Sequence, residues 1–243
     1  MNSLTDPPPD ESNTRPIESA QLPRRMGFWF WFCVWFWLLL LLGPVILGLL
    51  KPVIFGGDSG HRASVEAFGN IKEIALALCA FDQDYGQYPN ADTIEAVRKK
   101  TDTLLPLGTN TSNDYFRQLI AAECIDDEKC FFARIRENSR MPDNRMNGAQ
   151  ALEKGECGFS YIIGPDSSGK PPQPLLVTPL IPGTDRFDPK PFAGKAVIFR
   201  TDLSTTIEPI DKHGHVLDAA GNNLLDPSNP VWAGKPPHIV WPE

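Results

Sequence analysis

NIKEIALALCAFDQDYGQYPN, residues 70–90, is the stretch of sequence that decides the fold. Apolar residues recur in it and just before it at spacings of three and four, which is the period of one face of an α-helix. They are Val65, Phe68, Ile71, Ala75, Leu78 and Phe81. Gly86 is a natural end for a helix, and Pro89 prevents the helix from resuming. The sequence therefore predicts one amphipathic helix over residues 63–85.

Beyond this helix the sequence predicts two short helices and then strands. Helices are expected over residues 92–100, with Asp92 as the cap, and from Ser112 or Asn113 onward. Short apolar runs between Gly and Pro clusters are typical of strands. They are FFARI at 131–135, GFSYIIG at 158–164, PLLVTPL at 174–180, KAVIFRT at 195–201 and TTIEPI at 205–210. Short loops separate the later runs, so we expect an α+β fold in which the amphipathic helix packs on an antiparallel sheet.

The connection between the first two predicted strands is long and polar. It covers residues 136–156. Connections of this length without secondary structure are uncommon in compact domains. The stretch is either a flexible surface loop or contains an element that the pattern does not reveal.

Toward the N-terminus, residues 27–50 read GFWFWFCVWFWLLLLLGPVILGLL and contain no charged side chain. As a helix rising 1.5 Å per residue they would extend about 36 Å, which is enough to cross a hydrocarbon core of about 30 Å. A secretory signal peptide also has a basic flank before an apolar run, but that run is usually shorter. The sequence therefore predicts a single transmembrane helix over residues 27–50, with the lipid bilayer as its partner.

The residues around this segment predict its orientation and the remaining domains. More basic side chains precede the segment than follow it, which favours a cytoplasmic N-terminus; these residues are Arg15, Arg24, Arg25, Lys51 and Arg62. Residues 1–26 are polar and rich in proline, so we expect a disordered cytoplasmic tail. Residues 51–62 contain Pro52 and three glycines and are expected to be a linker. Residues 63–243 would form one head outside the cytoplasm.

The composition argues against two classes of function. A formal net charge of −7 and a pI near 5.2 do not suit a nucleic-acid partner, which requires a concentrated basic face. The chain has four histidines and no G-x-S-x-G, H-E-x-x-H or P-loop motif. We therefore expect neither nucleic-acid binding nor an enzyme.

Four cysteines follow the apolar segment, and a head outside the cytoplasm would expose them to oxidation. They are Cys79, Cys124, Cys130 and Cys157. Four cysteines allow three pairings that the sequence does not resolve. A disulfide between Cys124 and Cys130 is favoured by their proximity in the sequence, and free buried thiols are the alternative.

The stretch at 70–90 resembles the end of the long N-terminal helix of type IV pilin-like proteins, especially the major pseudopilins of type II secretion. In that family, N-x-K-x-I-x-x-A-L leads into D-x-G-x-Y-P, where the helix ends and the head begins. The matching residues are Asn70, Lys72, Ile74, Ala77, Leu78, Asp84, Gly86, Tyr88 and Pro89. KAVIFRTDLST, residues 195–205, also resembles the strand and turn written F-x-D-G-S in such heads, with Leu203 in place of the glycine.

The resemblance implies a structural or assembly role in a type II secretion or type IV pilus system. It implies a single-pass protein of the bacterial inner membrane, with a periplasmic head and other pilin-like or secretion-system subunits as partners. Prepilins are cleaved between a Gly and a Phe, and Gly27 and Phe28 stand at that junction. The fifth residue of the processed family chain is a Glu that pairs with a neighbouring N-terminal amine. Here it is Phe32, which implies a permanently anchored head or a minor component.

A second function class remains open, an anchored binding module for a small ligand or calcium. Some pseudopilin heads bind calcium near the C-terminus, and Asp218, Asn222 and Asp226 supply oxygen donors here. Their spacing is not that of an EF-hand, and such residues are also common in turns. Trp232 and Trp241 either stack on carbohydrate or cover an edge of the core. No other cofactor is predicted.

Overall fold

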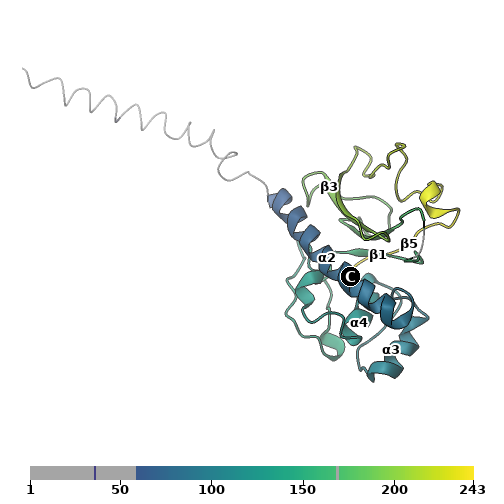
Figure 1. The fold of residues 1–243 in the computed structure, drawn as a ribbon. Helices are drawn as coiled ribbons and strands as arrows, with labels where there is room; N and C mark the ends of the chain where they lie inside the picture. The colour runs from purple at the N-terminus through teal and green to yellow at the C-terminus, as the bar shows by residue number, and fades with distance from the viewer. Residues whose placement is uncertain (1–35, 37–58, 168–169) are drawn as a thin grey trace, which may run out of the picture. The chain divides into compact units, whose positions relative to one another are not determined.

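The structure, a computed structural model, describes Phe36 and residues 59–167 and 170–243. The chain divides into the units Met1–Gly57 and Asp58–Glu243, and all the elements below belong to the second. This unit has an α+β fold with three α-helices and a five-stranded antiparallel sheet (Figure 1). In the described part of the chain, no helix combines the length and apolar character needed to cross a membrane.

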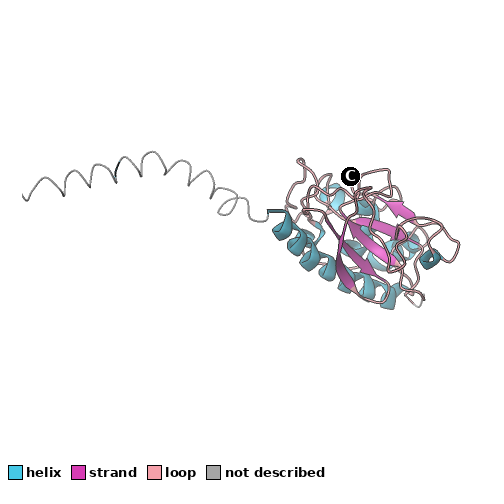
Figure 2. Cartoon of the chain, turned by 90° about the horizontal axis from the view of Figure 1, so that it is seen from above, coloured by secondary structure: helices cyan, strands magenta, loops and turns pink. Residues whose placement is uncertain are grey.

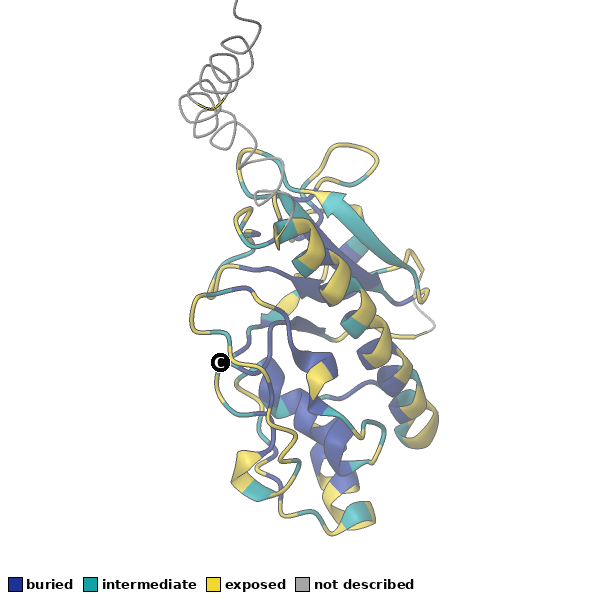
Figure 3. Ribbon diagram, turned by 90° about the vertical axis from the view of Figure 1, so that its left-hand side faces the viewer, coloured by how far each residue is buried: buried dark blue, intermediate teal, exposed yellow. Residues whose placement is uncertain are grey.

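The longest element is helix α2, Ser59–Tyr85, whose inner face packs against strands β3 and β4. The predicted core positions Ile71, Ala75, Leu78 and Phe81 are buried, as predicted. Val65 was predicted on the same face, but it is 50% exposed because the buried stripe passes through its neighbours Ser64 and Ala67 instead. Figure 3 shows this division along the helix, with exposed residues on one side and buried residues on the other.

Helix α2 begins four residues earlier than predicted, within the stretch expected to be a linker. The reason lies at Gly60, where the first turn approaches the backbone after Phe192 closely. A Cβ at this glycine would lie 2.9 Å from atoms of Ala193. The absence of a side chain allows this close contact, and tertiary packing thereby overrides the low helix propensity of glycine.

Two short helices follow α2, and both lie close to their predicted positions. Helix α3 spans Thr93–Thr101, but Asp92 makes no capping hydrogen bond. Asn90 takes that role because its Oδ1 accepts hydrogen bonds from the backbone N–H groups of Asp92 and Thr93. Helix α4 spans Ser112–Ala121 and begins with a reciprocal capping box between Thr111 and Asp114.

The five strands form an antiparallel sheet in the order β4-β3-β2-β1-β5. The strands are β1 Ser160–Ile163, β2 Pro174–Thr178, β3 Lys195–Arg200, β4 Thr205–Pro209 and β5 His238–Val240. The first four form the predicted meander, and the sequence did not predict β5, which has only three residues. The run at 131–135 was wrongly predicted as a strand. Its first residue ends the 3₁₀ helix η1, Glu128–Phe131, and the rest has no strand pairing. The N–H of Ile135 donates to the carbonyl of Ala133 at 2.9 Å, which makes a tight turn there.

The stretch 136–156 contains one short element, the 3₁₀ helix η2, Gly148–Gln150. A third 3₁₀ helix, η3, Pro230–Trp232, lies in the C-terminal loops. Both faces of the sheet are buried. Val197 and Phe199 of β3 join the core under the helices, while Ala196 and Ile198 join a smaller core under the C-terminal loops. Figure 2 shows α2 running alongside the strands, with long loops around the rest of the sheet.

Candidate functional site

The end of helix α2 is the structural counterpart of the D-x-G-x-Y-P motif. Gly86 has a φ of 76° and its N–H donates to the carbonyl of Asp82 at 2.7 Å. Tyr88 is buried, and the hydroxyl of Tyr161 on β1 donates to the carbonyl of Pro89 at 2.9 Å. The motif therefore ends the helix and fastens that end to the first strand of the sheet.

A cleft opens beside this helix end, with a volume of about 420 Å³. The polar residues that line it include Asp82, Asn90, Asp92, Tyr161 and Asp166. Burial raises the pKa of the Tyr88 phenol to about 12, and the charges of Asp82 and Asp166 add to the increase. The cleft is acidic and phenolic, so it is suited to a cationic group rather than an anion.

The turn between β3 and β4 contains Leu203, which stands where the F-x-D-G-S pattern has glycine. Leu203 has a φ of 67°, in the left-handed region that glycine adopts without strain. Its N–H donates to the carbonyl of Arg200 at 3.0 Å, and Asp202 accepts hydrogen bonds from the N–H and hydroxyl of Ser204. The leucine therefore occupies a glycine-type conformation, with its side chain 61% exposed.

The structure brings two of the three predicted calcium ligands together. Asp218 Oδ1 accepts hydrogen bonds from the N–H groups of Ala220 and Asn222, and its Oδ2 accepts from the Asn229 amide at 2.9 Å. These donors, led by the N–H of Asn222, hold the pKa of Asp218 below its usual range. Asp226 faces Ser228 instead, and that side chain lowers its pKa.

The loop at 218–229 is therefore accounted for by internal hydrogen bonds. Throughout the described ranges, no group of three or more His, Cys, Asp and Glu side chains is placed to hold a metal ion. Calcium at Asp218, Asn222 and Asp226 stays a prediction. The donors around Asp218 would have to move aside for a cation to reach both of its oxygens.

The disulfide predicted between Cys124 and Cys130 is not formed, because the two cysteines face different surroundings. Both are free, as are Cys79 and Cys157. Cys124 follows α4 and is half buried, with Asp84 and Lys100 nearby. Cys130 points into the core, where burial raises its pKa strongly. Proximity in the sequence was a poor guide because η1 turns the second cysteine inward.

Trp232 and Trp241, for which both carbohydrate stacking and covering of a core edge were considered, have their indole N–H groups bonded to the protein. Trp232 is 3% exposed and donates to the carbonyl of Leu224 at 3.0 Å. Trp241 donates to the carbonyl of Thr184 at 3.1 Å and is half buried. The burial of Trp232 supports the alternative role of covering the core.

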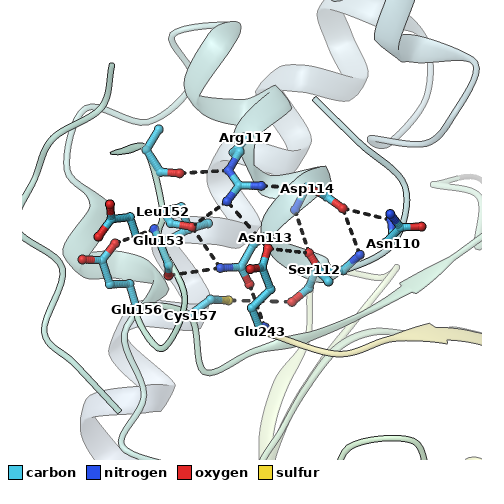
Figure 4. A network of polar contacts seen from close by, with 12 residues as sticks. Asn110, Ser112, Asn113, Asp114, Arg117, Leu152, Glu153, Glu156, Cys157 and Glu243 are labelled. Carbon is cyan, nitrogen blue, oxygen red and sulfur yellow. Dashed lines mark hydrogen bonds and ion pairs between the residues drawn. The ribbon is translucent and has the colours of Figure 1, made fainter. Parts of the chain in front are cut away.

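A buried polar network at the start of α4 was not predicted (Figure 4). Arg117 donates to the carbonyls of Ala151 and Leu152 and pairs with Asp114 at 2.8 Å. Asn113 donates to the Leu152 carbonyl and accepts from the N–H of Glu243. The T-x-x-D spacing of Thr111 and Asp114 predicts the capping box, but nothing in the sequence indicates the distant partners of this network.

The predicted processing residues Gly27 and Phe28 lie outside the described residues. The transmembrane helix predicted over 27–50 lies outside them as well, apart from Phe36, which is helical. No protein-family model, curated protein or solved structure matches this chain. The functional assignment therefore depends on the residues and on the geometry of the head.

Proposed function

We propose that this protein is a membrane-anchored, pilin-like component of a type II secretion or type IV pilus system. Residues 1–26 would be a cytoplasmic tail, and residues 27–50 would cross the bacterial inner membrane once. The head would lie in the periplasm and contact other pilin-like or secretion-system subunits. The role is structural or related to assembly, and it is a non-classical one because Phe32 replaces the assembly carboxylate.

The observation that carries the proposal is the packing of α2. This helix of 27 residues lies along β3 and β4 of an antiparallel meander, and it follows closely on the charge-free segment at 27–50. The motif ending the helix at Gly86 and the glycine-type turn at Leu203 agree with the resemblance at two further places. Together they supply the order of parts that a pilin-like chain requires.

The proposal is tested by the N-terminal residue of the protein recovered from bacterial membranes. Mass spectrometry should find Phe28 if the chain is processed, and Gly27→Leu should then retain the tail because the cleavage site is lost. An intact Met1 in the membrane fraction would leave an anchored head that is not processed as a pilin. Recovery of the full chain from the soluble fraction would overturn the membrane anchor.

A second experiment addresses the partners. Cross-linking in cells, followed by purification through the head, should recover pilin-like or secretion subunits. A variant, Leu76→Glu, tests whether α2 makes the contact. It places a charge at a leucine that is 72% exposed on the outer face of this helix. Loss of the cross-links in this variant would place the contact on α2, and a monomer without cross-links would contradict an assembly role.

The second candidate function is an anchored module that binds a small cationic ligand. The cleft at the end of α2 favours it, since Asp82, Asp92 and Asp166 line one cavity. A ligand that binds only the folded head raises its melting temperature, and the stabilisation grows with the logarithm of the ratio of free ligand to Kd. Polyamines or calcium should therefore raise the melting temperature, and Asp82→Asn should reduce the effect if the cleft is the site.

A further inference from the structure

Two glutamates in the region between α4 and β1 are fully buried. Glu128, on η1, is 0% exposed, and Glu156 is 1% exposed. A buried carboxylate is costly unless its oxygens receive hydrogen bonds. Four buried side-chain atoms of the described residues have no hydrogen-bond partner, and Glu128 Oε2 and Glu156 Oε1 are two of them.

The other oxygen of each glutamate holds the backbone of the same short turn. The N–H of Leu152 donates to Glu128 Oε1 at 2.6 Å, and the N–H of Glu153 donates to Glu156 Oε2 at 2.6 Å. Figure 4 shows Glu153 and Glu156 linked beside Leu152. Because the two N–H groups are adjacent in the chain, both carboxyl groups lie against the same turn.

Glu156 has a cationic partner, whereas Glu128 forms no ion pair in the described residues. Arg140 Nη2 lies 3.0 Å from Glu156 Oε1, but it also binds Glu153 Oε2 at 2.6 Å, and its side chain is half exposed. Burial raises the pKa of Glu128, and the charges of Glu156 and Asp143 raise it further. Burial is also the largest cause of the raised pKa of Glu156.

Other charged residues of η1, the loop and helices α2 and α4 lie near Glu128 and Glu156 or near the neighbouring thiols of Cys130 and Cys157. They are Asp127, Lys129, Arg136, Asp143, Arg145, Glu73 and Arg117. Several of the cations already have acidic partners: Lys129 pairs with Asp127, Arg145 with Asp143, and Arg117 with Asp114. Glu128 forms no ion pair in the described part of the chain.

We propose that Glu128 and Glu156 form a proton-dependent latch that keeps the loop 136–156 closed. The pair binds one proton in the closed state. As the pH rises, this proton is released to solvent, and the loop is then free to open. This latch is independent of the function proposed above, because it rests only on the interior of the head.

A single proton on Glu128 accounts for its unpartnered oxygen, since Glu156 Oε1 already faces Arg140 Nη2 at 3.0 Å. A protonated Glu128 carries no charge and has an O–H donor in place of a buried anionic oxygen. Without this proton, two negative charges share one buried site, which disfavours the folded state. Because the folded pKa values are raised, the stabilisation is present at low pH and is lost as the pH rises through them.

The test is hydrogen exchange of the full chain in detergent, read as protection factors so that the intrinsic effect of pH is removed. Peptides covering residues 140–156 should lose at least about tenfold in protection between about pH 5 and about pH 8.5. Glu128→Gln keeps an acceptor for Leu152 and adds a permanent donor, so it should retain the protection at the higher pH. Glu156→Gln should do the same if the first variant does not fold.

The matched control is Glu137→Gln, which alters an exposed glutamate of the same loop. It should show the pH dependence of the unaltered chain. The latch is overturned if protection of the loop is equal at the two pH values, or if the control removes the difference. It is also overturned if calcium alone restores the protection at the higher pH, since the pair would then bind a metal ion rather than a proton.

Discussion

The two faces of the sheet are both buried, but they are covered in different ways. Regular helices cover one face, and the large core beneath them includes Ile74 and Phe81 of α2. Irregular loops cover the other face and contribute Phe187, Leu225 and Trp232 to the smaller core. The comparison shows that loops can cover a sheet face without helices when hydrogen bonds within the loops pair their backbone N–H and C=O groups.

On the loop-covered face, aspartate side chains accept hydrogen bonds from backbone N–H groups of the loops. In each case a carboxylate oxygen accepts a hydrogen bond from the N–H two residues further along, which is the arrangement of an Asx turn. These aspartates are Asp188, Asp202, Asp211, Asp218 and Asp226. On the helix-covered face, helical hydrogen bonds and close packing of apolar side chains have the larger part, and Asp127 and Asp143 form the same turn in the segment after α4.

Phe81→Ala should have the largest effect, because it removes a fully buried ring from the helix-covered face. The ring stacks on Tyr85 with centroids 4.3 Å apart. We expect a loss of about 3–5 kcal/mol in the free energy of unfolding. Pulse proteolysis in urea would measure it, and Leu76→Ala on the exposed side of α2 is the control. Similar losses for the two variants would contradict the assigned core face.

Leu225→Ala tests the loop-covered face in the same way. Leu225 is 0% exposed, so the expected loss is about 2–4 kcal/mol. Loops relax around a cavity more readily than a helix packed on a sheet, and the loss should therefore be below that of Phe81→Ala. Hydrogen exchange should also show faster opening of residues 211–232 than of α2. A larger loss than for Phe81→Ala would reverse the comparison.

Leu203→Gly should stabilise the head by about 0.5–1 kcal/mol, because the turn places a leucine at positive φ. The gain is modest, since glycine also increases the entropy of the unfolded chain. Gly86→Ala is the matched opposite change and should destabilise by about 1 kcal/mol at a φ of 76°. Thermal melting should show a higher melting temperature for Leu203→Gly and a lower one for Gly86→Ala. Shifts in the same direction would contradict the two turn geometries.

Asp218→Asn should have the smallest effect, and it should depend on pH. The pKa of Asp218 is lowered by the donors around it, so its stabilisation exists above its unfolded pKa of about 4 and is lost as the pH falls. The difference between the variant and the unaltered chain should shrink below about pH 4. Exchange of the Asn222 N–H would report it, and a difference that grows with acid would contradict the assignment.

The sequence predicted the helix-covered face better than the loop-covered face. The spacing of Ile71, Leu78 and Phe81 follows the period of a helix, and this local signal survives in the fold. The meander was also predicted, because each of its strands is an apolar run between Gly and Pro clusters. Only the connection between β3 and β4 is short, and residues 179–194 separate β2 from β3. The error at Val65 arose because the sequence pattern fits two buried faces about equally well. These faces differ by a rotation of one residue about the helix axis, and the buried one contains Ser64 instead of Val65.

The parts that were missed depend on contacts between distant residues. Strand β5 has three residues and is defined only by its pairing with β1. The sequence around Glu128 and Glu156 is polar and gives no sign that these two side chains are buried, since charged residues in a loop are usually exposed. Their backbone partners, Leu152 and Glu153, follow from the path of the loop rather than from any local motif.

The C-terminal residues have a consequence for the order in which the head can fold. Trp241 accepts a hydrogen bond from the N–H of Ser112, and Glu243 donates its N–H to Asn113, 130 residues earlier. Strand β5 likewise pairs with β1 from the far end of the chain. Contacts of such long sequence separation form slowly, because the intervening chain must be ordered first. In a chain that emerges N-terminus first, the first turn of α4 would therefore lack its hydrogen bonds with Trp241 and Glu243 until those residues are made.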